Sequence, residues 1–193
     1  KLPADVLYTN YRQTGYDEVD DPDEMKELKM RETQTITGID QFVGAIRATL
    51  EQLGEADNTI IVFTSDNGGN MYNSVEGITP TSNAPLRGGK ANVYEGGVRV
   101  PCIIDWPGVT AKNSRSDALI DSSDFYPTLI EAVGLTPKAN QKFDGMSIVP
   151  ALKGKPLGRN TLFSYFPHSP PIPEWLPPSI TVHHGDWKLI RIF

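Results

Sequence analysis

The chain has 193 residues, which is enough for one domain with a sizeable core. Its formal net charge of -6 argues against a nucleic-acid partner, because phosphate binding requires a net supply of Lys and Arg on one face. The single cysteine, Cys102, excludes an internal disulfide and a cysteine-based zinc site. No apolar run reaches the length of a membrane-spanning helix, so we expect no membrane partner.

The first periodic segment follows a polar, acidic stretch of residues 1–32, which we expect to be a solvated loop leading into a helix. From about Thr33, apolar residues recur at steps of three and four, and this spacing predicts an amphipathic helix. Its apolar residues are Ile36, Ile39, Phe42, Val43, Ile46, Leu50 and Leu53. Gly54 fits the left-handed residue just past the helix end. Residues 59–64 (TIIVFT) lack alternation, which is typical of a strand buried on both faces of a parallel sheet.

The middle of the chain is less regular. Residues 68–92 are rich in Gly, Asn, Ser, Thr and Pro, which predicts a long loop, and loops of this length in compact domains are usually functional or disordered. A second apolar run at residues 100–106 predicts a strand ended by Pro107 and Gly108. Cys102 lies inside that run, so we expect it to be a small buried residue.

A second helix follows these strands. Residues 118–121 predict a short strand, after which Ser122 or Ser123 caps a helix. Pro127 falls in the first turn of this helix, where its missing N–H costs little, and Gly134 closes the helix.

The chain changes character after about Arg159, where prolines become frequent and predict extended or looped backbone. Two short β runs, residues 180–184 and 187–192, flank the pair Gly185 and Asp186. This pattern predicts a β-hairpin at the end of the chain.

The sharpest local motif is residues 65–69 (SDNGG), directly after the predicted strand. Open α/β sheets place their ligands at the carboxyl ends of strands. Asp66 offers a carboxylate and Asn67 an amide oxygen, and adjacent hard oxygens suit Ca²⁺ or Mg²⁺ rather than zinc. A plain turn accounts for the same residues, so both interpretations stay open on this motif alone.

The second motif is residues 85–90 (PLRGGK), followed by residues 94–101 (YEGGVRVP). Two Gly pairs bracket Lys90 on an irregular loop. A lysine at such a place is a point charge that can reach an oxyanion. A surface lysine on a flexible loop is the alternative interpretation.

The ordered set of motifs resembles the type I sulfatases of the alkaline-phosphatase superfamily. SDNGG, PLRGGK, YEGGVRVP and the WPG of residues 106–108 match that family in order and spacing over residues 33–135. The weaker DGMS of residues 144–147 and GDWKL of residues 185–189 extend the match to the C-terminus.

The resemblance implies an α/β fold with a mixed, largely parallel sheet flanked by helices, as in alkaline phosphatase. It also implies a small antiparallel C-terminal subdomain. We expect residues 1–158 to form the C-terminal part of the catalytic domain, with the N-terminal half of that domain missing. We expect residues 159–193 to form the start of the subdomain.

The resemblance also implies the chemistry of the site. Asp66 and Asn67 match the family's second pair of ligands to a divalent cation, with Ca²⁺ expected first and Mg²⁺ as the alternative. Lys90 matches the lysine that binds the sulfate group beside the leaving oxygen. The family's nucleophile is a formylglycine made from a Cys/Ser-x-Pro-x-Arg segment, and this sequence contains no such segment. We therefore expect the formylglycine in the missing upstream part.

The expected function is hydrolysis of a sulfate ester by an arylsulfatase-type enzyme, on a small-molecule or, as we favour, a glycan substrate. A phosphodiesterase or phosphonate hydrolase of the same superfamily and a non-catalytic sulfatase-like module are the alternatives. The family suggests a periplasmic or extracellular protein. His168 on a Pro-rich loop and His183 on a predicted strand are the weaker predictions for substrate contact. Trp175 and Trp187 are candidates for stacking on a sugar ring, and packing in the core or the hairpin is the alternative interpretation.

Overall fold

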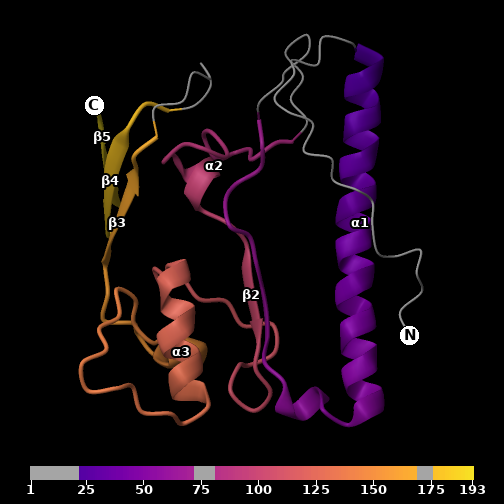
Figure 1. The fold of residues 1–193 in the computed structure, drawn as a ribbon, viewed down its shortest axis with the longest axis vertical. Coiled ribbons are helices and arrows are strands. Elements are labelled where there is room, and N and C mark those ends of the chain that lie inside the picture. Colours follow the sequence, from indigo (N-terminus) through magenta and orange to yellow (C-terminus); the bar gives the residue numbers. More distant parts are fainter. Residues whose placement is uncertain (1–21, 72–80, 169–175) are drawn as a thin grey trace. The chain divides into compact units, whose positions relative to one another are not determined.

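The computed structural model describes residues 22–71, 81–168 and 176–193 (Figure 1). These residues fall into two compact units. The first unit contains residues 22–59, 67–71, 81–90 and 94–99, and the second contains residues 60–66, 91–93, 100–168 and 176–193. Residues 1–21 of the acidic stretch and Trp175 lie outside the described residues, so the expectations for them stay predictions. None of the described helices is both long and apolar enough to cross a membrane.

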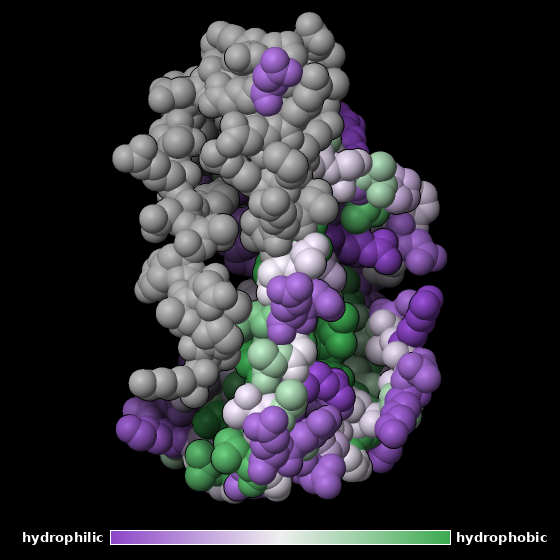
Figure 2. All heavy atoms as spheres, turned by 90° about the vertical axis from the view of Figure 1, so that its right-hand side faces the viewer, coloured by the Kyte–Doolittle hydropathy of each residue, from purple (hydrophilic) through white to green (hydrophobic). Residues whose placement is uncertain are grey.

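The long helix α1 of the first unit runs from Pro22 to Leu53, so it begins well before the expected start at Thr33. Proline at the first helical position is favourable, because its missing N–H would have no partner inside the helix. Gly54 closes the helix at φ +72°, which confirms the predicted left-handed residue. Apolar side chains of α1 are exposed, with Ile36 and Leu53 each at 69%. Figure 2 shows such apolar surface in green beside polar surface in purple.

The rest of the first unit is mostly irregular, as the composition of residues 68–92 predicts for its described part. The 3-10 turn η1 (Ala56–Asn58) follows α1. The short helix α2 (Glu95–Val98) is a single turn inside the YEGGVRVP motif. Its two glycines, Gly96 and Gly97, are buried.

The second unit begins with two paired strands, β1 (Ile61–Thr64) and β2 (Cys102–Asp105). Both strands lie where the sequence predicts them, but they pair antiparallel, with Ile61 opposite Asp105. Every strand pair among the described residues is antiparallel, which differs from the expected parallel arrangement. A parallel pair requires a crossover connection that is usually helical. In the segment between β1 and β2, the only helix among the described residues is the single turn α2.

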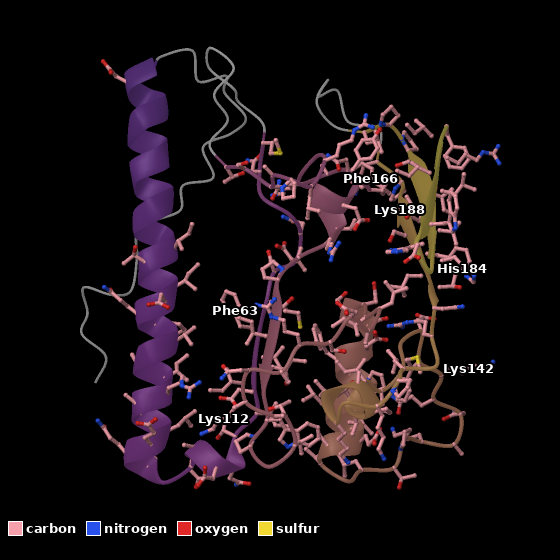
Figure 3. The ribbon with its side chains drawn as sticks, turned by 180° about the vertical axis from the view of Figure 1, so that it is seen from behind. Phe63, Lys112, Lys142, Phe166, His184 and Lys188 are labelled. Atoms are coloured by element: carbon pink, nitrogen blue, oxygen red, sulfur yellow. The ribbon has the colours of Figure 1, made fainter. Side chains whose placement is uncertain are left out.

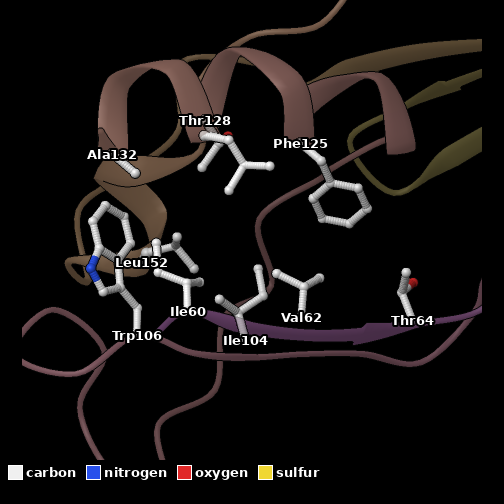
Figure 4. A pocket seen from close by; sticks show the side chains of 10 residues that line it. Ile60, Val62, Thr64, Ile104, Trp106, Phe125, Thr128, Ala132 and Leu152 are labelled. Carbon is white, nitrogen blue, oxygen red and sulfur yellow. The ribbon is translucent and has the colours of Figure 1, made fainter. Parts of the chain in front are cut away.

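Burial of these strands also differs from the expectation. Val62 is 39% exposed and Ile103 is 64% exposed, and Cys102 is exposed as well. The reason is that a strand is buried on both faces only where a layer covers each face. Within the second unit, a helix faces the pair across an apolar cavity of about 190 Å³ (Figure 4).

That helix is α3 (Phe125–Ala132), preceded by the 3-10 turn η2 (Ser122–Asp124) and followed later by the single turn α4 (Val149–Leu152). Pro127 in its first turn and Gly134 at φ +69° confirm the predicted start and end. The cap differs from the prediction, because Asp121 rather than a serine accepts the N–H of Ser123. Residues 118–121 are not a strand.

The chain ends in a three-stranded antiparallel sheet of β3 (Thr161–Phe166), β4 (Ser179–His184) and β5 (Trp187–Ile192). The strands β4 and β5 form the predicted hairpin, with His184 opposite Trp187. Gly185 takes φ +54° in the turn between them, a conformation that glycine adopts without a steric penalty.

A buried ion pair organises the second unit around the start of α3. Asp124 is 0% exposed and pairs with the Arg159 side chain, which is 14% exposed. Arg159 Nη1 donates to Asp124 Oδ1 at 2.9 Å, and Nη2 donates to Oδ2. Arg159 also donates to the carbonyl of Leu119, from Nε at 3.1 Å and from Nη2 at 2.7 Å. Such forked pairing gives geometric specificity as well as energy.

Backbone donors complete the shell of Asp124. Oδ2 accepts the N–H of Asp121 at 2.7 Å, and Oδ1 accepts the N–H of Met146 at 2.8 Å. Burial alone raises the pKa of Asp124, but the Arg159 guanidinium and the two backbone donors outweigh burial and hold that pKa below its ordinary value. The carboxylate therefore joins three segments that are distant in the sequence.

We expect Asp124→Asn to destabilise the protein by about 3–5 kcal/mol at pH 7, because Arg159 would keep a buried charge without its counter-charge. A depressed pKa contributes stability above the unfolded value of about 3.9, and this stability is lost as the pH falls through the folded value. The difference in the free energy of unfolding between the variant and the wild type should therefore become smaller below about pH 4. Denaturant unfolding at pH 7 and pH 3 measures it, with the exposed Asp117→Asn as the control.

Candidate functional site

Backbone hydrogen bonds gather the sequence motifs of the first unit into one cluster. The N–H of Gly68 donates to Gly97 O at 3.0 Å, which joins SDNGG to YEGGVRVP. The N–H of Lys90 donates to Gly69 O at 3.0 Å, which joins PLRGGK to SDNGG. The N–H of Gly96 donates to Arg87 O at 2.8 Å and closes the set. Motifs that are separate in the sequence thus form a single group of loops.

The paired glycines are required by the close approach of these loops. A Cβ on Gly68 would lie 1.6 Å from Gly96 O, and one on Gly96 would lie 2.0 Å from Gly88 O. A Cβ on Gly89 would lie 2.4 Å from Gly69 O. Because real Cβ atoms do not approach backbone oxygens this closely, only glycine fits these positions.

A polar side chain that the sequence analysis missed, Asn83, lies among these glycines. Its Oδ1 accepts the N–H of Gly69 at 2.9 Å. Its Nδ2 donates to Gly69 O at 3.1 Å and to Gly88 O at 3.0 Å. An asparagine beside two glycine pairs is a weak sequence signal, because Asn is common in every loop.

The two predicted metal ligands stand at the end of β1. Asp66 is exposed, and Asn67 is half-buried, with its Nδ2 donating to Gly68 O at 2.9 Å. That bond turns the amide oxygen of Asn67 away from the Gly68 carbonyl. A carboxylate and an amide oxygen are the hard donors that Ca²⁺ or Mg²⁺ prefers, so the pair fits the expected cation.

The fit is a partial one. Ca²⁺ takes about six to eight oxygen ligands, and this motif supplies only the side chains of Asp66 and Asn67. Within residues 22–71, 81–168 and 176–193, no group of three or more His, Cys, Asp or Glu side chains could hold a metal ion. A complete Ca²⁺ site would need further oxygen ligands besides Asp66 and Asn67.

Lys90 is half-buried on its loop, and its backbone is fixed to Gly69 O. In the part of the chain that the structure describes, no carboxylate forms an ion pair with its ammonium group. The next residue, Ala91, has φ +62°, a left-handed conformation that costs a non-glycine residue roughly 1–2 kcal/mol. The backbone around Lys90 is thus closely determined by its surroundings.

The neighbouring arginine has a different role. The Arg87 guanidinium carbon lies 4.0 Å from the ring centroid of Tyr94. This cation–π contact connects the PLRGGK and YEGGVRVP motifs through side chains, in addition to the backbone bond from Gly96 to Arg87. It keeps the Arg87 charge on an aromatic face.

The histidines belong to the second unit, whereas Asn67 and Lys90 belong to the first. His168 is exposed, with its ring 5.4 Å from that of Phe166 at an interplanar angle of 61°. His183 and the Gly185 carbonyl are 3.0 Å apart, so one ring nitrogen is engaged within the hairpin. His184 Nδ1 lies 2.7 Å from Thr161 Oγ1, and Figure 3 labels His184 on the C-terminal sheet. Substrate contact by His168 and His183 stays a prediction.

The apolar cavity lies away from these residues. It is contained in the second unit, between α3 and the strands β1 and β2, and its lining includes none of the predicted site residues (Figure 4). Its walls are apolar side chains such as Phe125, Leu129 and Trp106. Such a cavity offers no group that could orient a polar substrate, so we treat it as an interior packing gap.

The surroundings of the exposed Cys102 do not favour its thiolate. Desolvation by neighbouring atoms raises the pKa of its thiol, and the hydrogen bond with Thr64 offsets only part of that rise. A raised pKa lowers the thiolate fraction, and the thiolate is the reactive form.

Two protein-family models match this chain. The model described as Sulfatase matches residues 4–135, and the model described as N-sulphoglucosamine sulphohydrolase, C-terminal, matches residues 89–193. The chain belongs to the sulfatase family. It is 37% identical over 188 residues to a sulfatase of Formosa agariphila, covering 87% of this chain and 32% of that protein. The sulfatase chain thus spans about a third of the length of this relative.

Solved structures support the same fold. One is a protein in complex with its substrate D-glucosamine-2-N,6-O-disulfate, with a TM-score of 0.67 and 26% identity, covering 82% of this chain and 30% of that one. Another is a phosphonate monoester hydrolase from Silicibacter pomeroyi, with a TM-score of 0.60 and 26% identity, covering 81% and 31%. The predicted α/β class of the alkaline-phosphatase type is confirmed.

We expect Gly68→Ala to destabilise the loop cluster by about 1–3 kcal/mol, the range typical of overpacking, because the added methyl overlaps Gly96 O. Gly44→Ala in α1 is the control, since no heavy atom lies within 4 Å of a Cβ there. The control should stabilise by about 0.5–1 kcal/mol, as alanine favours a helix interior. Thermal unfolding of both variants measures the difference, and equal melting temperatures would contradict the proposed close packing.

Proposed function

We propose that the protein containing this chain is a sulfuric ester hydrolase that uses a divalent cation, Ca²⁺ in the first instance. The observation that carries the proposal is the loop cluster, which joins the SDNGG motif to the backbone of Lys90 through Gly69. Membership of the sulfatase family across nearly the whole chain supports it. The alternatives share this fold: a hydrolase that attacks phosphorus instead of sulfur, and a module without catalytic activity.

In this proposal, Lys90 binds a sulfate oxygen as a point charge. Its ammonium group has no ion-pair partner in the described residues, so an anionic substrate would meet an uncompensated cation. A net charge of -6 disfavours anions in general, and a local cation is therefore needed to select one. Fixing the Lys90 backbone in advance reduces the reorganisation that binding requires.

Asp66 and Asn67 would hold the cation in the same proposal. Their oxygen donors match its chemistry, and the hydrogen bond from Asn67 Nδ2 to Gly68 O fixes which way the amide faces. When bound, the cation supplies positive charge that stabilises the sulfate oxygens as negative charge develops. The nucleophile, which the family resemblance gives as formylglycine, would come from outside these residues, because the sequence contains no Cys/Ser-x-Pro-x-Arg segment.

We further propose a carbohydrate sulfate as the substrate class and a periplasmic or extracellular location. The C-terminal part matches a family model described for N-sulphoglucosamine sulphohydrolase, and a structural neighbour binds a sulfated glucosamine. Assays with N-acetylglucosamine 6-sulfate and 4-nitrophenyl sulfate test the substrate, and cell fractionation tests the location.

A phosphonate monoester hydrolase is the second candidate, favoured by the likeness to the Silicibacter pomeroyi enzyme. Peptide mass mapping of the full-length protein and a phosphonate monoester assay examine it together. Aldehyde conversion with turnover of sulfate esters would support the first candidate. Preferential turnover of the phosphonate would replace it with the second, and no turnover of either would favour a non-catalytic module.

Lys90→Ala should lower kcat for sulfate-ester hydrolysis by about 10²–10³-fold, the loss typical of removing one group that stabilises an oxyanion. Lys112→Ala is the control, because Lys112 is also a lysine but lies exposed on the second unit. Steady-state kinetics on the full-length protein measures both. A Lys90 variant as active as the Lys112 variant would remove Lys90 from the mechanism.

Asp66→Ala should raise the Ca²⁺ concentration needed for half-maximal activity, since it removes the charged member of the ligand pair. Calcium titration after chelator treatment measures the change. Asp117→Ala, which removes an exposed carboxylate of the second unit, should leave the calcium requirement unchanged. The same requirement in both variants would contradict the assignment of Asp66.

A further inference from the structure

The Asn83 side chain makes three hydrogen bonds to two backbone loops. An amide offers two N–H donors and a carbonyl acceptor. The acceptor takes the N–H of Gly69 at 2.9 Å, and the donors reach Gly69 O at 3.1 Å and Gly88 O at 3.0 Å. The segment is irregular and forms no strand ladder, so side-chain hydrogen bonds supplement the backbone bond between these loops.

The two loops bound by Asn83 are those that carry the proposed site residues. Gly69 follows Asn67 by two positions, and Gly88 precedes Lys90 by two positions. The carbonyl of Gly69 also accepts the N–H of Lys90 at 3.0 Å. Asn83 and the backbone of Lys90 therefore share one acceptor, and a shift of the Asn83 side chain changes the environment of both loops.

Space around Asn83 restricts what can replace it. A Cβ on Gly89 would lie 2.9 Å from Asn83 Nδ2, and one on Gly69 would lie 3.0 Å from Oδ1. The Asn83 amide thus lies too close to both glycines for either of them to carry a side chain without a shift. Aspartate has the right shape, but its carboxylate would face the carbonyls of Gly69 and Gly88 without a proton to donate.

We propose that Asn83 is a positioning residue for the sulfatase site, which sets the spacing between the Asn67 loop and the Lys90 loop. This inference rests on the proposed function for its effect on catalysis. The Asn83 side chain bonds to backbone atoms of Gly69 and Gly88. It acts through the backbone of Gly69 and Gly88, as residues that orient ligands do in other metal sites.

Asn83→Asp in the full-length protein tests the proposal, because it removes both donors and keeps the shape. Asn58→Asp is the matched control, since the Asn58 amide makes one exposed contact of 3.4 Å with Glu55. The measurements are KM and kcat with 4-nitrophenyl sulfate and N-acetylglucosamine 6-sulfate, Ca²⁺ affinity by calorimetry, and the hydrogen-exchange rate of the peptide that contains the Lys90 N–H. If Asn83→Asp does not fold, Asn83→Ser removes the bridge without adding charge.

We expect Asn83→Asp to weaken Ca²⁺ binding and to lower kcat/KM by about 10–100-fold each, the range typical of residues that orient ligands. Exchange at the Lys90 N–H should accelerate, while the control matches wild type in every measurement. A purely structural role would lower the melting temperature and the active fraction but leave KM and Ca²⁺ affinity unchanged, which would overturn the proposal. If wild type hydrolyses no sulfate ester, the proposed function fails. Hydrogen exchange then still decides on Asn83, because an unchanged Lys90 rate overturns it and a faster rate supports it.

Discussion

The absence of side chains at Gly68, Gly89 and Gly96 is the constraint on which the candidate site depends. Each position has a backbone oxygen within 2.4 Å or less of where a Cβ would stand. Only glycines allow three separate motifs to meet closely enough for backbone hydrogen bonds of 2.8–3.0 Å between them. The backbone positions around Asn67 and Lys90 therefore depend on glycines, which have no functional side chain.

The second unit is stabilised by a charged side-chain interaction. There the central element is a fully buried charge, Asp124, with Arg159 and two backbone donors around it. A buried carboxylate is tolerated only when it is paired and hydrogen-bonded, and this one is both. It connects the start of α3, the segment at Met146 and Arg159, which lies two residues before β3. The unit's framework thus depends on one satisfied ion pair as well as on apolar packing.

The charged groups of the two units differ in whether they have an ion-pair partner. Asp124 and Arg159 neutralise each other, which suits a structural role. Lys90 has no carboxylate partner among the described residues, which suits binding to an external anion. Arg87, which lies on the same loop, has its charge placed over the Tyr94 ring and is accounted for by that contact. Of the two cations in the PLRGGK motif, Lys90 is the one that we propose as the group that binds an anionic substrate.

The sequence by itself determined the elements whose signals are local. The left-handed glycines after α1 and α3, the hairpin at Gly185 and the SDNGG position after β1 all follow from residue type and short spacing. Only the tertiary structure decided the antiparallel pairing of β1 with β2, the exposure of Cys102, and the roles of Asn83 and Asp124. Those features depend on which distant backbone groups come within hydrogen-bonding distance. Residue spacing in the sequence does not predict such contacts. Asparagines in loops and aspartates at helix caps are common in proteins, so neither residue type indicates which distant backbone group it will bond.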